Sequence, residues 1–181
     1  MRLPSRWILR VEKYVKKILE ANVYDVAIQT PLEMAPLLSS RMGSEVLLKR
    51  EDMQPVFSFK IRGAYNKISR LTPKARKKGV ITASAGNHAQ GVAMAATRLG
   101  IRSRIVMGEN TPSIKIDAVK AFGGEVILHG DTYDEAAVFA RKEATRTGAT
   151  YIHPFDDADV IAGQGTIGME IMRQYTGSLD A

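Results

Sequence analysis

Lys60 is the residue of this sequence with the most distinctive chemistry. It follows Phe57 and Phe59 and precedes a predicted helix, within the segment Ser-Phe-Lys-Ile-Arg-Gly at 58–63. A lysine attacks a carbonyl only as the neutral amine, but its ordinary pKa of about 10.4 keeps it charged at neutral pH. Apolar surroundings and the positive end of a helix dipole both disfavour the charged form. The segment therefore predicts a lysine of lowered pKa that can form a Schiff base, the alternative being an ordinary surface lysine.

A second segment with chemical potential is a small polar loop between a predicted buried strand at 80–83 and a predicted helix at 87–99. Backbone N–H groups at the start of a helix have no helical acceptor and can bind an anion. Small side chains let a carboxylate approach this backbone, and Asn87 adds an amide donor. The alternative for Asn87 is an ordinary helix N-cap. The loop consists of Ser84, Ala85, Gly86, Asn87 and His88.

Together these segments resemble the threonine dehydratase (threonine ammonia-lyase) family, and its biosynthetic branch more than its catabolic branch or serine racemase. The resemblance runs from about Tyr14 to the C-terminus, and the ordered set of motifs makes it specific. The matching segments are 49–65, 83–93, Thr30-Pro31-Leu32, Pro154-Phe155-Asp156 and 160–166.

The resemblance implies a fold-type II enzyme with pyridoxal 5'-phosphate as cofactor. Such an enzyme converts L-threonine to 2-oxobutyrate and ammonia, the first step of isoleucine biosynthesis, and L-serine is a second candidate substrate. By position, Lys60 would bind the cofactor covalently and later remove the substrate's Cα proton, while the pyridine ring takes up the electrons. Asn87 would donate to the ring oxygen, with Phe59 as a third cofactor contact. The substrate carboxylate would bind the loop Ser84, Ala85, Gly86, Asn87 and His88.

The family pattern continues beyond the part that this sequence matches. A glycine run that binds the cofactor phosphate and a residue that contacts the pyridine nitrogen both come later, and this sequence ends at Ala181. Since backbone amides supply much of the affinity for a phosphate, we expect weak cofactor binding by this chain alone. The alternatives are a non-catalytic remnant or half-subunit that binds a ligand or a partner chain, and a basic binding protein.

The strands and helices that must position these residues alternate along the sequence. This order predicts an α/β fold of three αβα layers with a mostly parallel sheet, and the resemblance implies the fold-type II architecture similar to tryptophan synthase β. Residues 66–152 are expected to form a small domain, and 1–65 with 153–181 parts of a larger cofactor domain. Strands are predicted at 46–49, 80–83, 104–107, 125–128 and 150–151, and helices at 5–21, 33–41, from Lys60, 87–99, 112–122 and 133–147.

Glycines at 163–168 spell G-x-G-x-x-G, which in another context would indicate a dinucleotide site. That motif must follow a strand, whereas 156–162 is typical of a turn and a helix. We therefore interpret the glycines as positions of close helix packing.

Composition excludes several classes of function. The sequence has no cysteine, so it has no disulfide or thiolate metal site, and it fits a cytoplasmic protein. Its histidines, His88, His129 and His153, are too scattered to predict a metal site. No apolar run is long enough to span a membrane. Unpaired strand edges and exposed apolar surface are expected to favour a homo-oligomer.

The net charge of +7 is concentrated in residues 1–17 and 67–78. Neither segment has interleaved aromatic residues or a recognised motif, so we predict no nucleic-acid binding and interpret the charges as solvated faces. The helix at 5–21 is amphipathic, with Trp7 and Ile8 on its apolar face. It is expected to pack on the fold, the alternative being a helix on a membrane surface.

Overall fold

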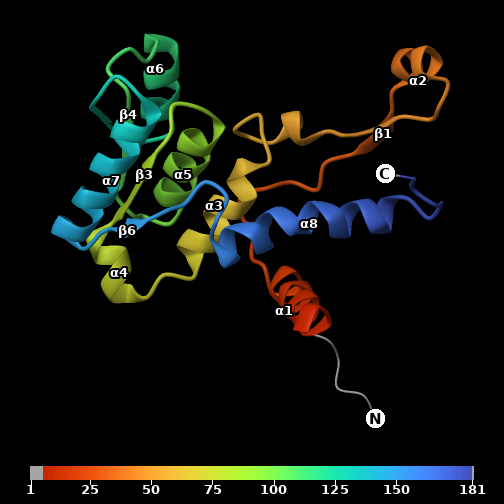
Figure 1. Ribbon diagram of the computed structural model, residues 1–181, viewed down its shortest axis with the longest axis horizontal. Coiled ribbons are helices and arrows are strands. Elements are labelled where there is room, and N and C mark those ends of the chain that lie inside the picture. Colours follow the sequence, from red (N-terminus) through yellow and green to blue (C-terminus); the bar gives the residue numbers. More distant parts are fainter. Residues whose placement is uncertain (1–5, 181) are drawn as a thin grey trace.

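The computed structural model describes residues 6–180 and shows an elongated molecule (Figure 1). An α/β unit forms one end, a two-stranded arm forms the other, and two helices, α3 and α8, lie between them. The helices are α1 (Arg6–Leu19), α2 (Pro36–Met42), the 3₁₀ helix η1 (Glu51–Met53), α3 (Lys60–Ser69), α4 (Pro73–Lys78), α5 (Asn87–Arg98), α6 (Ser113–Ala121), α7 (Tyr133–Thr147) and α8 (Ala158–Gln174). The strands are β1 (Leu32–Met34), β2 (Leu47–Lys49), β3 (Val80–Ala83), β4 (Ser103–Met107), β5 (Glu125–Leu128) and β6 (Thr150–Tyr151).

The α/β unit contains one parallel sheet with the strand order β5-β4-β3-β6. Every residue of β3 and β4 is buried, as expected for central strands that helices cover on both sides. Alternate side chains face α7 on one side and α5 with α6 on the other. The first face joins Ile81, Ala83 and Val106 to Ala136 and Ala140 of α7. The second face joins Val80, Ile105 and Met107 to Val92 of α5 and Val119 of α6. The predicted three-layer fold is therefore confirmed.

Helix α3 lies between the α/β unit and α8, and glycines allow its backbone to come close to α8. A Cβ at Gly163 would lie 2.5 Å from the carbonyl oxygen of Arg62, and one at Gly63 would lie 2.8 Å from that of Val160. The absence of a side chain at Gly165 lets Ile18 of α1 pack against α8 in the same way. The predicted role of these glycines in helix packing is thus confirmed for two of the three positions in the motif, since the space around Gly168 is open.

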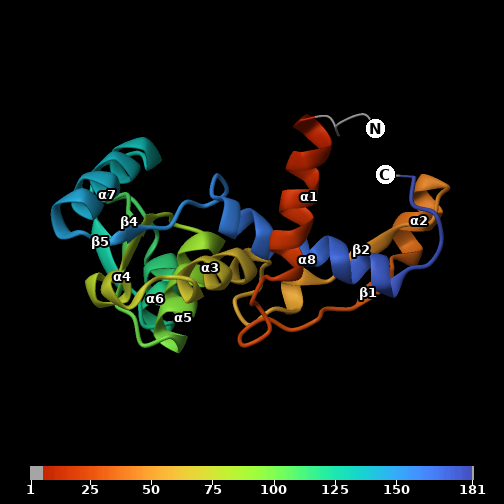
Figure 2. The same cartoon turned by 90° about the horizontal axis from the view of Figure 1, so that it is seen from below.

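Helix α1 stands away from the rest of the molecule and contacts α8 at its C-terminal end (Figure 2). There Lys17 forms a 2.8 Å ion pair with Asp159 of α8. Val15 and Leu19 stay exposed. The helix therefore packs on the fold through its last turn; the side chains of Trp7 and Ile8 lie outside the part that the structure describes.

The arm is built from β1 and β2, which pair antiparallel with Leu32 opposite Lys49, and from α2 between them (Figure 1). Helix α2 has no buried residue, and Leu37 is 84% exposed. Met172 on α8, which runs toward the arm, is 79% exposed. This end of the molecule therefore carries the exposed apolar surface that the sequence predicts.

The basic segment at 67–78 is partly used inside the fold. Lys67 pairs with Asp157 at 2.7 Å, and Arg76 donates to the carbonyl oxygens of Leu71 and Ser69. Within residues 6–180, no helix is both long and apolar enough to cross a membrane, and no cluster of acidic and histidine side chains is arranged to hold a metal ion.

Candidate functional site

Lys60 is the first residue of α3, and its amine is held near the start of that helix. Nζ donates a 2.9 Å hydrogen bond to the carbonyl oxygen of Pro154, in the loop between β6 and α8. Burial lowers the pKa of the Lys60 amine, because a charged ammonium loses solvation there. The amine is therefore closer to its reactive, neutral form than that of a fully solvated lysine.

The two phenylalanines before Lys60 contribute less burial than the sequence suggests. Phe57 is 76% exposed and does not shield the amine, which corrects the predicted apolar setting. The Phe59 ring lies with its centroid 5.2 Å from Nζ, where an aromatic face favours the charged form. The lowering of the Lys60 pKa is caused by burial at the start of α3.

The predicted loop lies at the carboxyl end of β3, where α5 begins. Gly86 is the N-cap of α5, and no side chain caps this helix. The Ser84 hydroxyl accepts instead from the N–H of Gly86 within the loop, at 3.2 Å. Asn87 is the first helical residue and is exposed, so it is not the N-cap that the alternative interpretation required. The first N–H groups of α5 and the Asn87 amide are therefore available to an anionic ligand.

His88 differs from its neighbours because its side chain points into the protein. It is 4% exposed, and Nε2 lies 3.1 Å from the carbonyl oxygen of Ile152. Burial lowers the pKa of His88 to about 4, so the imidazole is neutral at physiological pH. Of this residue, only the backbone can take part in an anion site on the loop.

The lysine and the loop come together because α5 crosses α3 at a glycine. A Cβ at Gly91 would lie 3.1 Å from the carbonyl carbon and oxygen of Lys60. Gly91 is one turn into α5 from the loop, so this contact fixes the loop beside the start of α3. The positive charge of Lys60 also contributes to the lowered pKa of His88, after burial. Sequence reasoning did not identify Gly91; its only signal was a glycine inside a predicted helix.

A buried ionic network behind the site was also missed. Arg62 is fully buried in α3 and donates to Glu51 at 2.8 Å and to Glu170 of α8 at 2.6 Å. Lys49 pairs with the other oxygen of Glu170 at 2.6 Å. The network joins four segments of the chain and holds α3, and with it Lys60, in one position. An arginine that follows an aromatic segment gives little sequence signal for such a role.

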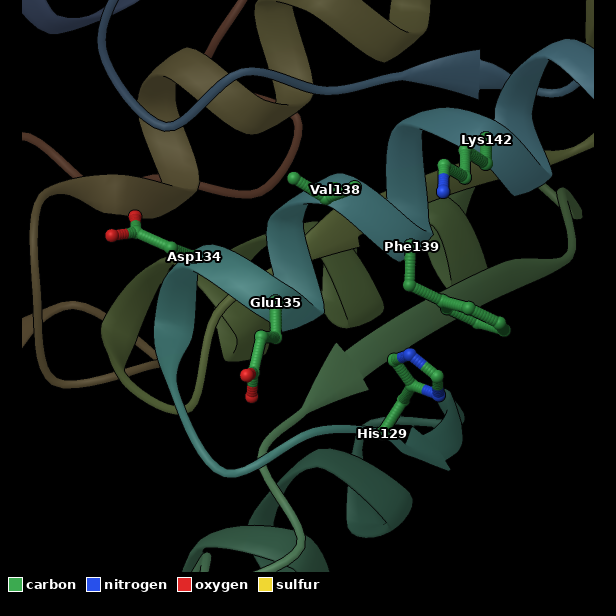
Figure 3. Close-up of a pocket in the computed structure, with 6 residues that line it drawn as sticks. All are labelled: His129, Asp134, Glu135, Val138, Phe139 and Lys142. Atoms are coloured by element: carbon green, nitrogen blue, oxygen red, sulfur yellow. The ribbon is translucent and has the colours of Figure 1, made fainter.

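One cavity adjoins the loop, and a larger one lies elsewhere, along α7. One of about 110 Å³ adjoins Ala85 and lies at the carboxyl ends of the strands, between Met107 and Tyr133. A larger one of about 430 Å³ lies along α7, where His129 stacks on Phe139 (Figure 3). None of the predicted site residues lines the larger cavity, so we do not assign it to this site.

Comparison with known proteins supports the assignment of the fold. The chain is 57% identical to the biosynthetic L-threonine dehydratase of Burkholderia multivorans over 171 residues, which is 93% of this chain and 34% of that protein. It is also 57% identical to threonine dehydratase 1 of Solanum lycopersicum over 93% of this chain and 28% of that protein. The chain therefore spans about a third of the length of these relatives.

Solved structures agree with the sequence relatives. The processed form of threonine deaminase isoform 2 from Solanum lycopersicum superposes with a TM-score of 0.88 at 57% identity, over 92% of this chain and 46% of that one. Maize serine racemase gives a TM-score of 0.85 at 34% identity, over 90% of this chain and 50% of that one. The model of the pyridoxal-phosphate dependent enzyme family matches residues 23–181. Since this match covers most of the sequence, the chain belongs to the family of pyridoxal-phosphate dependent enzymes.

Proposed function

We propose that this chain is part of an enzyme that converts L-threonine to 2-oxobutyrate and ammonia with pyridoxal phosphate as cofactor. The observation that carries this proposal is the amine of Lys60, whose pKa is lowered by burial, beside the uncapped start of α5. The relatives named threonine dehydratase and threonine deaminase support the choice of substrate and reaction.

The residues around Lys60 fit a cofactor with an aldehyde and polar ring substituents. Four buried polar side-chain atoms in residues 11–180 have no hydrogen-bond partner, and one of them, Ser58 Oγ, belongs to the lysine segment. Such orphaned atoms are uncommon in native structures, which makes Ser58, two positions before Lys60, a candidate contact for the cofactor. Lys60, Phe59 and Asn87 would hold the cofactor, which supplies an electron sink for charge that develops at the substrate's Cα.

The chain's own residues have defined tasks in this proposal. The first N–H groups of α5, with Ser84 and Asn87 beside them, bind the substrate carboxylate, aided by the positive end of the helix dipole. Bound in this way, the substrate presents its Cα toward the start of α3. The neutral amine of Lys60 then takes the Cα proton, and its lowered pKa raises the fraction of amine able to do so at neutral pH.

The finer features of the proposal concern substrate range, assembly and location. L-serine differs from L-threonine by one methyl group, which is worth about 1–3 kcal/mol of discrimination, so we propose both as substrates with L-threonine preferred. The exposed Leu37, Met42 and Met172 support a homo-oligomer. We propose a cytoplasmic location, although some relatives are named chloroplastic. The division into a small domain at 66–152 and a larger one stays a prediction, and its first boundary falls within α3.

The test is a product assay with purified protein, pyridoxal phosphate and L-threonine, in which 2-oxobutyrate and ammonia are both measured. We expect equal amounts of the two products, loss of both in Lys60→Ala, and no loss in Lys74→Ala, which removes an exposed lysine of α4. Absence of product from the wild type, with cofactor bound at Lys60, would favour a ligand-binding half-subunit over an active enzyme.

A further inference from the structure

The imidazole of His88 is buried at the site without any task in the proposed reaction. Its Nε2 lies 3.1 Å from the carbonyl oxygen of Ile152. A carbonyl only accepts, so Nε2 must carry the hydrogen, and in the neutral ring Nδ1 is then a bare acceptor. Among the residues that the structure describes, this Nδ1 is buried and has no partner.

Packing alone does not explain an imidazole at this position. A buried acceptor without a donor costs free energy, whereas an apolar side chain of similar size would fill the same space without that penalty. The ring also stays neutral in the fold, because burial lowers the pKa of His88 to about 4. What the imidazole contributes that leucine would not is the single N–H directed at Ile152.

The Ile152 carbonyl begins the segment 152–154, which contacts Lys60 through the carbonyl of Pro154. Two residues later, the carbonyl oxygen of Pro154 accepts the 2.9 Å hydrogen bond from Nζ of Lys60. The strand side of the segment is held independently, because the Thr82 hydroxyl donates to the same Ile152 oxygen at 2.8 Å and the Ile152 N–H donates to Ile81. Of these hydrogen bonds to Ile152, only the one from His88 comes from α5, the helix that follows the substrate loop.

We infer that His88 is a positioning residue for Lys60: its Nε2–H fixes the Ile152 carbonyl, and segment 152–154 thereby keeps the Pro154 carbonyl in place to hold the Lys60 amine. This inference rests on the proposed role of Lys60 as the reactive amine. It links the loop and the lysine through one short segment, so that α5, β6 and α3 set the position of the amine together.

Among the residues that the structure describes, two titratable groups lower the pKa of His88 in addition to burial. They are Lys60 of α3 and His153 of the same segment, whose charges both add to the lowering of the pKa of His88 by burial. His153 is itself held in the turn, because its Nδ1 accepts from the backbone N–H groups of Asp156 at 2.8 Å and Phe155 at 3.3 Å. Neither group replaces the N–H that His88 directs at Ile152.

The experiment measures the reactivity of the Lys60 amine directly, without cofactor or substrate. Each protein is labelled briefly with acetic anhydride over a series of pH values, and the extent of acetylation at every lysine is determined by mass spectrometry. The proteins are the wild type, His88→Leu, His88→Gln, His88→Asn and the control His129→Leu, which removes an exposed histidine just after β5. Circular dichroism and thermal denaturation confirm that each variant is folded.

We expect loss of the Nε2–H contact to release segment 152–154 and admit water to Lys60. In His88→Leu the midpoint of Lys60 acetylation therefore moves up toward that of exposed Lys74, with labelling at neutral pH at least about threefold slower. His88→Gln keeps an N–H donor of similar reach and should retain the wild-type profile. His88→Asn is too short to reach Ile152 and should behave like His88→Leu, whereas His129→Leu should not change Lys60.

A folded His88→Leu with the wild-type Lys60 profile would overturn the inference. If His88→Leu does not fold, the comparison of His88→Gln with His88→Asn decides, and equal Lys60 profiles in these two would overturn it as well. The proposed function fails separately, namely if Lys60 of the wild type titrates like Lys74 or if L-threonine yields no product.

Discussion

Arg62 and Glu170 are joined by two hydrogen bonds in the interior of the protein, although 108 positions separate them in the sequence. Nη1 lies 2.6 Å from Oε1 and Nη2 lies 3.0 Å from Oε2, so the guanidinium and the carboxylate face each other in parallel. The pair fixes α3 against α8. Because Arg62 follows Lys60 by two positions, it also fixes the start of α3 where the amine lies.

Replacing Arg62 with methionine should strongly destabilise the protein. The change leaves the largely buried carboxylate of Glu51 without its charged partner and removes one of two cations from Glu170. Removing one member of a buried ion pair costs about 3–5 kcal/mol, which urea denaturation would measure as a lower free energy of unfolding.

The matched control for Arg62 is Arg146→Met on α7. Arg146 also bonds a carboxylate, that of Glu143, at 2.7 Å, but its side chain is 69% exposed. A solvent-exposed pair of this kind contributes little to stability, so Arg146→Met should have a much smaller effect than Arg62→Met. Equal losses in the two variants would show that burial of the Arg62 network does not matter.

Alanine at Gly163 and at Gly168 should have opposite effects, although both residues lie in α8 and in the same glycine motif. A Cβ at Gly163 would meet backbone atoms of Arg62 and Gly63 at 2.5–2.9 Å, and backbone cannot move aside without separating α3 from α8. We expect a loss of about 1–3 kcal/mol or more. At Gly168 nothing lies within 4 Å, so alanine should gain about 0.5–1 kcal/mol from helix propensity. Thermal denaturation of both variants tests this, and a stable Gly163→Ala would refute the close packing.

Phe57 has a left-handed backbone conformation, with φ of 56°, three positions before Lys60. This conformation is strained for a bulky L-residue and costs about 1–2 kcal/mol. Phe57→Ala loses the exposed ring but retains the backbone strain. Phe57→Gly loses the ring and also relieves the strain. We expect the glycine variant to be about 1 kcal/mol more stable than the alanine variant in urea denaturation, the reverse of the usual order. If the alanine variant is as stable as the glycine variant, or more stable, the turn before Lys60 is not strained.

His88 should make stability depend on pH between its folded and unfolded pKa values, about 4 and 6.5. In this window the unfolded chain binds the proton that the folded protein excludes, so stability rises with pH. The contribution of His88 to stability is complete above its pKa in the unfolded chain. It is lost as the pH falls toward its pKa in the folded protein, by an amount on the order of 3 kcal/mol. His88→Leu should remove this part of the pH dependence in urea denaturation, and His129→Leu should keep it. If the free energy of unfolding of His88→Leu depends on pH as in the wild type, other groups cause the effect.

Much of the fold could be predicted because its elements obey local rules. The strand at 125–128, the helix at 133–147 and the strand at 150–151 were predicted with the bounds that the structure shows. The helix α4 was missed, because its run of basic residues between Pro73 and Lys78 has no apolar periodicity. Thr72 starts that helix as its N-cap, with its side chain accepting from the N–H of Ala75.

The site was predictable to the extent that its residues are adjacent in sequence. Lys60 at the start of a helix and the loop before α5 both follow from local patterns. The Pro154 carbonyl that accepts from Lys60 lies 94 positions away and is a backbone group, so no side-chain pattern indicates it. The inward direction of His88 was also missed, since a histidine beside a polar loop gives no sign of which way its ring points.

The most direct measurement is the site at which pyridoxal phosphate becomes attached. The protein is incubated with the cofactor at low concentration, reduced with borohydride and digested, and the modified lysine is identified by mass spectrometry. We expect one adduct per chain on Lys60, absent from Lys60→Ala and unchanged in Lys74→Ala. Labelling spread over the exposed lysines, with Lys60 modified no more than Lys74, would contradict a reactive amine at the start of α3.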